Sequence, residues 1–235
     1  MNTPNPNWFE ALSQERLLAE FSVWSSDLLN IGRDLDKVEP YAALLHIDVA
    51  DGHFAPAFLF FPDLVDRIRK YSSIPIHVHL MTQPSIVLEQ IEQFAQAGAD
   101  VITVHAEMGD MLAPAMEKIA ALKLRSGIVL RVETPVSAIE PWLDQVSFVT
   151  LLGTAIGVKG KGLHEAALDR MAEARGLIQK HVQRTGQKII LVADGGIREE
   201  TTPLLRKAGA EAVVLGSLAY GSTDLGQRME WLRSL

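Results

Sequence analysis

Histidines and aspartates with metal-binding spacing lie at the ends of short apolar runs. His46 and Asp48 end one run, and His77 and His79 end the next. Side chains two residues apart in an extended strand point to the same face of a sheet, so each pair presents its two polar groups together. Imidazole and carboxylate groups suit Zn²⁺, Mn²⁺ or Fe²⁺, and a further acidic strand end follows at Asp194. The spacing predicts a site for one divalent metal ion.

Most of the histidines fall in one part of the chain, between His46 and His105. A single one of them is readily explained as a hydrogen-bonded histidine of the protein interior. A group is harder to explain in this way, because burying several ionisable side chains in one layer is costly unless they are paired or metal-bound. The remaining His164 and His181 fall in a predicted helix and are expected at the surface.

Composition limits the class of protein. A chain of 235 residues that is 48% hydrophobic has the size of one α/β barrel domain. The net charge of −7 comes without a long run of either sign, which argues against a nucleic-acid or membrane-surface partner. Cysteine is absent, so the sequence excludes disulfides and thiolate ligands, and any metal must be held by nitrogen and oxygen.

The start of the chain lacks the basic and apolar regions of a signal peptide, and no apolar run is long enough to cross a bilayer. We therefore expect a cytoplasmic protein. Residues 1–20 are expected to form a short flexible extension with a short helix, and residues 21–235 the barrel. A homo-oligomer is also expected. Phe58, Phe60 and Phe61 either form a subunit contact, cover the active site or pack on the barrel rim.

Apolar runs alternate with amphipathic stretches along the chain. Strands are predicted at 21–24, 43–48, 75–80, 100–105, 127–132, 147–152, 188–193 and 212–216. Helical patterns fill the gaps between the strands, among them residues 62–71, 84–97, 111–124, 164–185 and 199–208. An eightfold strand–helix repeat indicates a single-domain (β/α)₈ barrel, which we favour over the doubly wound open sheet that gives the same alternation.

Two segments of the chain resemble each other. Residues 95–102 and 206–213 each show a helix that ends at glycine and turns directly into a buried strand, at the entries to the fourth and eighth strands. The similarity fits two stacked half-barrels. The alternative is that Ala-Gly-Ala turns recur in any α/β protein, because glycine suits the left-handed end of a helix.

A barrel fold would bring the polar strand ends together, because barrel enzymes carry their chemistry at the C-terminal ends of the strands. Gly195-Gly196 and Gly216-Ser217 end the last two strands, where barrels commonly offer backbone N–H groups to a phosphate. Each pair alone is equally well explained as a turn of the chain. Together they favour a phosphate site.

These motifs carry a family resemblance over nearly the whole chain from about residue 21. Ser22-Val23-Trp24-Ser25-Ser26-Asp27, His46-Ile47-Asp48-Val49-Ala50-Asp51-Gly52-His53-Phe54, His77-Val78-His79-Leu80-Met81, Asp194-Gly195-Gly196-Ile197 and Gly216-Ser217 together resemble the ribulose-phosphate 3-epimerase family. The resemblance implies a metal ion held by His46, Asp48, His79 and Asp194. It also implies that Asp48 and Asp194 act as acid and base. The residues that it implies contact substrate or phosphate are Ser22, His79, Met81, Gly157, Gly160, Gly195, Gly196, Gly216 and Ser217.

Departures from the family pattern concern the substrate pocket. Residues 153–162 replace the family's usual Met-Thr-Val-Asn-Pro-Gly loop and introduce Lys159 and Lys161, which either contact an anionic group or are solvated. Gly153 and Ala50 stand where the family commonly has methionines, so a roomier pocket is expected.

Charged residues also depart from the family pattern. His77 replaces a usual aspartate. Arg131 and Glu133 follow the fifth strand, as substrate contacts or, more in keeping with surface charges, as a local ion pair.

The sequence thus predicts a metal-dependent 3-epimerase of a ketose phosphate, with D-ribulose 5-phosphate as the leading substrate. Another pentulose or hexulose phosphate, such as allulose 6-phosphate, is the alternative. A phosphate-binding aldolase or decarboxylase ranks lower, because no lysine stands in the second- or third-strand motif. A non-catalytic sugar-phosphate-binding barrel would have no need for two opposed carboxylates.

Overall fold

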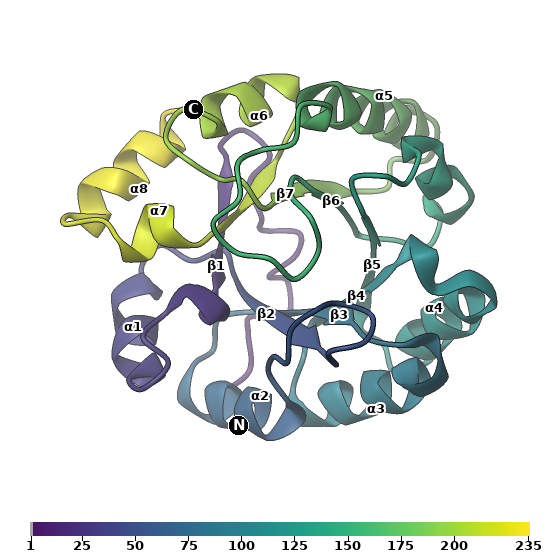
Figure 1. Ribbon diagram of the computed structural model, residues 1–235, viewed down its shortest axis with the longest axis horizontal. Coiled ribbons are helices and arrows are strands. Elements are labelled where there is room, and N and C mark those ends of the chain that lie inside the picture. Colours follow the sequence, from purple (N-terminus) through teal and green to yellow (C-terminus); the bar gives the residue numbers. More distant parts are fainter. Residues whose placement is uncertain (1) are drawn as a thin grey trace.

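The computed structural model describes residues 2–235 and forms one closed barrel of eight parallel strands (Figure 1). The strands follow one another around the barrel in sequence order, and β8 pairs with β1 through Ala212 and Leu18. This closure confirms the predicted (β/α)₈ barrel and excludes the doubly wound open sheet. The strands are β1 (Leu18–Ser22), β2 (Leu44–Ala50), β3 (Ile76–Met81), β4 (Val101–His105), β5 (Arg125–Leu130), β6 (Phe148–Leu152), β7 (Ile190–Asp194) and β8 (Ala212–Leu215).

Helices surround the ring of strands, as Figure 1 shows. In α2, Val65 and Ile68 lie one helical turn apart and are buried, which is the apolar stripe expected of a helix that packs on a sheet. The α-helices are α1 (Ile31–Val38), α2 (Pro62–Tyr71), α3 (Val87–Ala97), α4 (Leu112–Ala121), α5 (Ala167–Thr185), α6 (Thr202–Ala208), α7 (Ser217–Tyr220) and α8 (Leu225–Arg233). The 3₁₀ segments are η1 (Val23–Ser25), η2 (Pro84–Ile86), η3 (Ala106–Met111) and η4 (Val136–Trp142).

Differences from the predicted elements lie at their ends. Strand β1 occupies Leu18–Ser22 rather than 21–24, because the residues after Ser22 turn into η1. The helix predicted at 84–97 begins as the 3₁₀ turn η2, and residues 164–166 lie outside α5. Apolar periodicity marks the middle of an element, whereas its last turn depends on local hydrogen bonds.

The barrel interior is divided into an apolar and a polar part. At the N-terminal end of the barrel, a small cluster of buried apolar side chains fills the space, including Leu44, Val101 and Phe148. Further along the same strands the inward positions are polar, as at His46 in β2 and His77 in β3. This layering places the ionisable groups towards the C-terminal ends of the strands.

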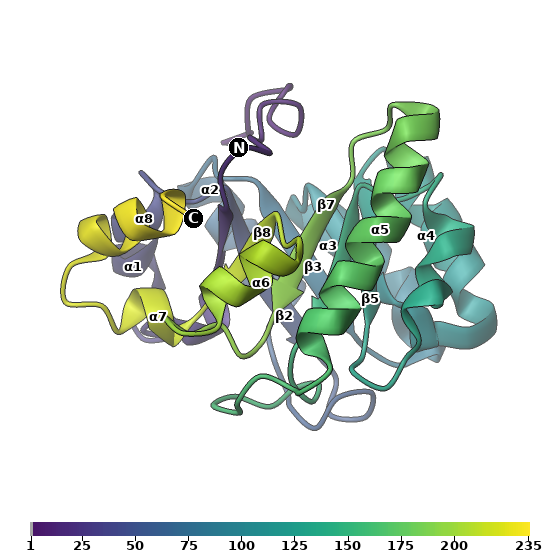
Figure 2. The ribbon, with the colours of Figure 1, turned by 90° about the horizontal axis from the view of Figure 1, so that it is seen from above.

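The N-terminal segment closes the apolar end. In Figure 2 it lies at one end of the barrel, and the long loops after β2 and β6 extend from the other. The ring of Phe9 packs edge-on against Phe148 with 5.5 Å between ring centroids. The Lys188 Nζ donates to the carbonyls of Phe9, Glu10 and Leu12 at 2.8, 3.1 and 2.6 Å. Residues 5–12 form hydrogen-bonded turns in place of the short helix expected there.

The two similar segments repeat a three-dimensional arrangement. Gly98 and Gly209 both have positive φ, 102° and 120°, at the end of a helix. A Cβ on Gly98 would lie 2.6 Å from the Cγ of Arg69, and one on Gly209 would lie 2.7 Å from the side chain of Arg175. In each half of the barrel an arginine from an earlier helix therefore crosses directly over the glycine.

The same arginines pair with an acidic residue two positions after each glycine. The distances are 2.6 Å to Asp100 and 2.8 Å to Glu211. Each of these carboxylates also accepts the backbone N–H of the preceding strand, from Ile76 and Leu191 respectively. The repeat extends beyond the Ala-Gly-Ala turn itself, which supports the interpretation as two half-barrels.

Candidate metal centre and active site

A cavity of about 380 Å³ opens at the C-terminal ends of the strands. Its floor includes Asp48 from β2, His79 from β3 and Asp194 from β7. Ser22 from β1 lies beside them and donates its hydroxyl to Asp48 Oδ2 at 3.1 Å. The position agrees with the rule that barrel enzymes place their chemistry at this end.

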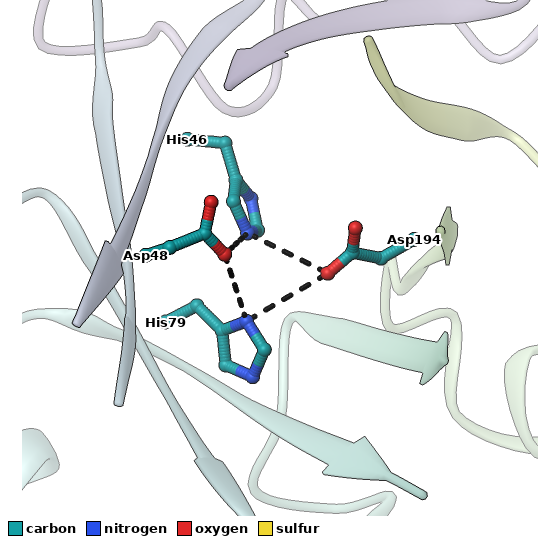
Figure 3. Close-up of side chains that lie close together, drawn as sticks. All are labelled: His46, Asp48, His79 and Asp194. Atoms are coloured by element: carbon teal, nitrogen blue, oxygen red, sulfur yellow. Dashed lines mark ion pairs between the residues drawn. The ribbon is translucent and has the colours of Figure 1, made fainter. Parts of the chain in front are cut away.

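Four side chains converge on one point, as Figure 3 shows. The Nε2 of His46 lies 3.4 Å from Asp48 Oδ1 and 3.8 Å from Asp194 Oδ2. The Nδ1 of His79 lies 3.5 and 3.7 Å from the same two oxygens. All four candidate ligand atoms are within 4.8 Å of one another, so the predicted set of residues is brought together.

The two histidine nitrogens that face the centre fit a bound cation. Nε2 of His46 and Nδ1 of His79 are buried and have no hydrogen-bond partner among the described residues. An unpartnered buried polar atom is unfavourable, and a metal ion would satisfy both nitrogens at once. Two imidazoles and two carboxylates form a donor set for Zn²⁺, Mn²⁺ or Fe²⁺ rather than for a soft, thiolate-seeking metal.

The two carboxylates of the cluster have different electrostatic environments. Burial acts to raise the pKa of Asp48, but the charges of His46 and His79 outweigh it, and the pKa is lowered. Burial dominates at Asp194 and raises its pKa, in part against the charge of His46. Burial acts to lower the pKa of His46, yet Asp48 and Glu20 hold it well above its usual value. In the metal-free protein Asp48 is thus ionised, whereas Asp194 takes up a proton more readily.

A second polar layer lies beneath the cluster. Glu20 on β1 is fully buried, and its Oε2 lies 3.0 Å from His46 Nδ1 and 2.9 Å from His77 Nδ1. The Nε2 of His77 lies 3.1 Å from Thr103 Oγ1. Burial acts to raise the pKa of Glu20, but the two imidazoles lower it to about 2. Burial lowers the pKa of His77, which keeps that ring neutral.

His105 on β4 flanks the cluster on its other side. Its Nε2 lies 2.9 Å from His79 Nε2, and its Nδ1 lies 2.9 Å from Glu107 Oε2. Burial lowers the pKa of His105 to about 4. Although burial acts to raise the pKa of Glu107, hydrogen bonds from His105 and Thr134 lower it to about 2. The neutral His105 therefore connects a candidate metal ligand to an ionised carboxylate.

Glycines form the rim of the cavity beside the last two strands. Gly195 and Gly196 have φ of 90° and 71°. A Cβ at Gly195 would lie 2.5 Å from Thr154 Oγ1, so only glycine fits there. Across the rim the side chain of Arg198 reaches to 3.4 Å from Ser217 Oγ. At the rim, glycines allow a ligand to approach the backbone closely, and Arg198 supplies a guanidinium group. Both features suit an anion.

The loop between β6 and α5 crosses the barrel mouth (Figure 1) and lines the cavity. Lys159 Nζ lies 4.3 Å from the centroid of the Trp24 ring and donates to the Trp24 carbonyl. Gly157 has φ 68° and lies against Ala55. Lys161 also lines the cavity and is exposed. Lys159 therefore binds the loop to Trp24, just after β1. Both lysines lie at the cavity rather than on a remote part of the surface.

The expectation of a roomier pocket is wrong at Gly153. A Cβ at this position would lie 2.5 Å from the Gly195 carbonyl oxygen and 2.7 Å from Leu163. Backbone and a leucine already occupy that space, so this glycine permits close approach of β6 to the residues after β7. At Ala50, which packs with Met81 in a small buried cluster, the expectation stays a prediction.

Comparison with known proteins gives a consistent result. A model of the ribulose-phosphate 3 epimerase family matches residues 18–220. Ribulose-phosphate 3-epimerase of Bacillus subtilis (strain 168) is 34% identical over 214 residues, covering 90% of this chain and 96% of its own length. The enzyme of the same name from Escherichia coli (strain K12) is 29% identical over 215 residues, covering 91% and 93%.

The chain belongs to the ribulose-phosphate 3-epimerase family. The resemblance seen in the motifs is thereby confirmed. Solved structures agree on the fold alone. A 3-hexulose-6-phosphate synthase has a TM-score of 0.65 at 18% identity, covering 93% of this chain and 98% of its own. An orotidine 5'-phosphate decarboxylase from Pyrococcus horikoshii OT3 has a TM-score of 0.65 at 14% identity, covering 92% and 98%.

In this member of the ribulose-phosphate 3-epimerase family, the residues predicted to contact metal, substrate or phosphate meet in one place. All of them except His46 line the cavity, and His46 lies buried directly beneath it. Their individual roles stay predictions. The lining residues among them are Ser22, Asp48, His79, Met81, Gly157, Gly160, Asp194, Gly195, Gly196, Gly216 and Ser217.

Two sequence-based expectations outside the cavity are wrong. His181 is buried, because its position on α5 continues the inward stripe of Ala174 and Ile178. Within residues 2–235, Arg131 makes no ion pair with Glu133. The Arg131 guanidinium instead stacks on Phe54, 4.2 Å from the ring centroid, and donates to its carbonyl.

Three residues at the site, Glu20, Glu107 and Arg198, were not predicted. Glu20 is the most visible of them in the sequence, since an acidic residue interrupts an otherwise apolar run two positions before Ser22. Glu107 stands two positions after His105, just beyond the predicted fourth strand. Arg198 follows Asp194-Gly195-Gly196-Ile197 in a loop, where sequence periodicity gives no direction for a side chain.

Proposed function

We propose that this chain is a metal-dependent 3-epimerase that interconverts D-ribulose 5-phosphate and D-xylulose 5-phosphate. The observation that carries the proposal is the approach of Asp48 and Asp194, from separate strands, to the same two unpartnered histidine nitrogens on the floor of one cavity. The names of the relatives from B. subtilis and E. coli support the substrate.

Inversion of a carbon beside a ketone needs two proton-transfer groups. A proton must leave one face of the carbon and another must arrive on the opposite face. We assign these transfers to the carboxylates of Asp48 and Asp194, which point toward each other across the cavity floor in Figure 3. Both carboxylates line the same cavity floor, so one can take the proton from one face of the carbon while the other delivers a proton to the opposite face.

His46, Asp48, His79 and Asp194 would hold one divalent cation, Zn²⁺, Mn²⁺ or Fe²⁺. When bound, the cation supplies Lewis-acid stabilisation of the negative charge that develops as the proton leaves. Ser22 keeps Asp48 oriented through its hydroxyl.

The phosphate of the substrate fits the glycine rim. We assign its contacts to the backbone at Gly195, Gly196 and Gly216, to the Ser217 hydroxyl and to the Arg198 guanidinium. The close approach permitted by the glycines and the positive charge of Arg198 both favour an anion over a neutral group. Unphosphorylated D-ribulose should therefore be a poor substrate.

The test is the conversion of D-ribulose 5-phosphate by the Zn²⁺-, Mn²⁺- or Fe²⁺-loaded protein, followed by ¹H NMR. We expect D-xylulose 5-phosphate to form. Asp48→Asn and Asp194→Asn should each reduce kcat about 100-fold or more, because a carboxamide neither takes nor returns the proton. Circular dichroism should show both variants folded, and Asp63→Asn, an exposed residue on α2, serves as the control.

The other outcomes of this assay are distinct. Faster turnover of allulose 6-phosphate than of D-ribulose 5-phosphate would show that the substrate is different but that the reaction is still a 3-epimerisation. Near-normal kcat in either Asn variant would contradict the two-carboxylate mechanism. Binding of both sugar phosphates without turnover would indicate a non-catalytic barrel.

Phe58 and Phe61 beside the cavity mouth are 84% and 60% exposed, which is consistent with a subunit contact in a homo-oligomer. The structure contains no helix within residues 2–235 with the length and apolar character needed to cross a membrane. The homo-oligomer and the cytoplasmic location remain predictions, and size-exclusion chromatography with light scattering tests the first.

A further inference from the structure

Each histidine of the candidate metal cluster has its outward ring nitrogen in a hydrogen bond that leads to a buried or half-buried carboxylate. On one side Glu20 Oε2 lies 3.0 Å from Nδ1 of His46. On the other side His105 Nε2 lies 2.9 Å from Nε2 of His79, and His105 Nδ1 lies 2.9 Å from Glu107 Oε2. Neither carboxylate belongs to the four-residue cluster, and the proposed function assigns no role to either one.

Two hydrogen-bond paths are thus defined, one from His46 to Glu20 and one from His79 through His105 to Glu107. The position of the hydrogen in each bond follows from which of its two atoms can only accept. An ionised carboxylate only accepts, so His46 donates from Nδ1, and in the neutral ring that binds a cation the lone pair is on Nε2, facing the centre. Likewise Glu107 requires the proton of His105 on Nδ1. The Nε2 of His105 then accepts, and His79 must donate from Nε2.

Both paths therefore give the same result at the centre. The nitrogens left with free lone pairs, Nε2 of His46 and Nδ1 of His79, are the two that lack a hydrogen-bond partner. A histidine binds a cation only through an unprotonated nitrogen, and the hydrogen bond at its other nitrogen fixes which one that is.

The surroundings hold both paths in place. The second proton that Glu20 Oε2 accepts comes from Nδ1 of His77, whose Nε2 faces the hydroxyl of Thr103. Glu107 Oε1 accepts the backbone N–H of Arg131 at 3.0 Å and the Thr134 hydroxyl. Each carboxylate is thus fixed by contacts other than the histidine path, so it can impose the tautomer rather than follow it.

We propose that Glu20 and Glu107 are positioning residues for the metal centre: Glu20 directly, and Glu107 through His105, set the tautomers in which His46 and His79 bind a divalent cation. The inference rests on the proposed metal site. It adds two carboxylates that never touch the cation but control its affinity.

The test compares metal binding by Glu20→Gln and Glu107→Gln with that of the wild type. Zn²⁺ dissociation constants from competition with a chelator should rise about 10- to 100-fold in each variant. Glu211→Gln is the matched control, because Glu211 is equally a buried glutamate but lies at the opposite end of the barrel beside Gln14 and Arg175. It should reduce thermal stability and leave Zn²⁺ affinity unchanged.

The ¹H NMR spectrum of the Co²⁺-loaded protein reports on each histidine separately, so a general loss of stability cannot mimic the predicted change. In the Co²⁺-loaded wild type, ¹H NMR in H₂O should show two paramagnetically shifted imidazole N–H resonances that vanish in D₂O, one from His46 and one from His79. Glu20→Gln should broaden or shift only the first, and Glu107→Gln only the second. Should Glu20→Gln fail to fold, Glu107→Gln carries the test, since its side chain is 20% exposed.

Two results would overturn the inference and are distinguishable. Wild-type Zn²⁺ affinity and unchanged N–H resonances in the folded Glu107→Gln variant would show that Glu107 does not position His79. Failure of the wild type to bind Zn²⁺ or Co²⁺ would contradict the proposed metal site itself, and the inference with it.

Discussion

Asp51 differs from its neighbour Asp48 although both are aspartates of the same motif. Its Oδ1 accepts the backbone N–H groups of His53 and Phe54 at 2.9 and 2.8 Å, and its Oδ2 accepts that of Gln83 at 2.7 Å. These bonds join the turn after β2 to the residues after β3. Asp51 thus shapes the turn into Gly52.

Asp51→Ala should therefore act on stability first. We expect the free energy of unfolding to fall by about 1–3 kcal/mol, because the backbone donors lose a charged acceptor. The kcat should stay within a few-fold of the wild type. Urea unfolding and the epimerase assay on the same preparation measure both quantities. A fall in kcat as large as that of Asp48→Asn, at unchanged stability, would place Asp51 in the chemistry instead.

Glu107 makes the stability of the metal-free protein depend on pH. Its pKa is lowered from 4.5 to about 2 in the folded protein, so the unfolded chain binds a proton more readily. The stabilisation is fully present above pH 4.5 and is lost as pH falls through this window toward 2. Glu20, with its pKa also lowered to about 2, adds to the same loss.

We expect the free energy of unfolding to fall less steeply between pH 4.5 and 2 in Glu107→Gln than in the wild type. The amide does not titrate, so the contribution of Glu107 is missing from the variant, whereas those of Glu20 and of the other carboxylates with a lowered pKa, such as Asp48, remain. Urea unfolding at closely spaced pH values gives the two slopes. Equal slopes would contradict the lowered pKa of Glu107.

Side-chain relations within one strand can be predicted from the sequence, whereas contacts between strands depend on how the strands pair. The pairing of His46 with Asp48, and of His77 with His79, on one face was predictable because strand alternation is a local property. Glu20 was not assigned a role, because its contact with His46 depends on how β1 and β2 pair. His181 was misplaced for a related reason, since which face of α5 points inward is set by packing.

At the scale of elements, the loop after β6 and the loop after β7 form the two sides of the substrate cavity. Lys159 is held by Trp24 on one side, and Arg198 lies near Ser217 on the other. Only Arg198 stands beside the glycine rim proposed for phosphate. The two cationic residues should therefore respond differently to substitution.

Arg198→Met should raise KM for D-ribulose 5-phosphate about 10-fold or more, with kcat changed little, because a phosphate contact is shared by ground and transition states. Lys159→Met should raise KM less and alter kcat as well, because it frees a loop that covers the reacting carbon. Steady-state kinetics on both variants measures the split. A larger rise in KM for Lys159→Met would move the anion contact to the β6–α5 loop.

The central residues of helices and strands were predictable from the sequence, whereas the residues at which they begin and end were less so. Helix α2 has the predicted bounds, Pro62–Tyr71, because proline marks its first turn and its apolar stripe is regular. Residues 23 and 24, in the turn η1 after β1, are predicted as strand because Val23 and Trp24 favour extended backbone. The bond from the Ser26 N–H to the Val23 carbonyl instead closes a 3₁₀ turn.

At the scale of the whole molecule, barrel closure produces the site. Asp48 and Asp194 are far apart in the sequence and on strands that are not neighbours, yet closure brings them to the same two histidine nitrogens. The eightfold alternation predicted this closure, whereas the angle at which side chains meet required the structure. An open sheet would have separated β2 from β7 and abolished the site.

The exchange of one carbon-bound proton with solvent tests the proposed epimerisation most directly. Metal-loaded protein is incubated with D-ribulose 5-phosphate in D₂O, and the products are examined by ¹H NMR and mass spectrometry. Proton removal and return by Asp48 and Asp194 predicts D-xylulose 5-phosphate that carries deuterium at C3, and loss of this exchange in Asp48→Asn. Formation of D-xylulose 5-phosphate without deuterium at C3, or no exchange by the metal-loaded wild type, would contradict the account.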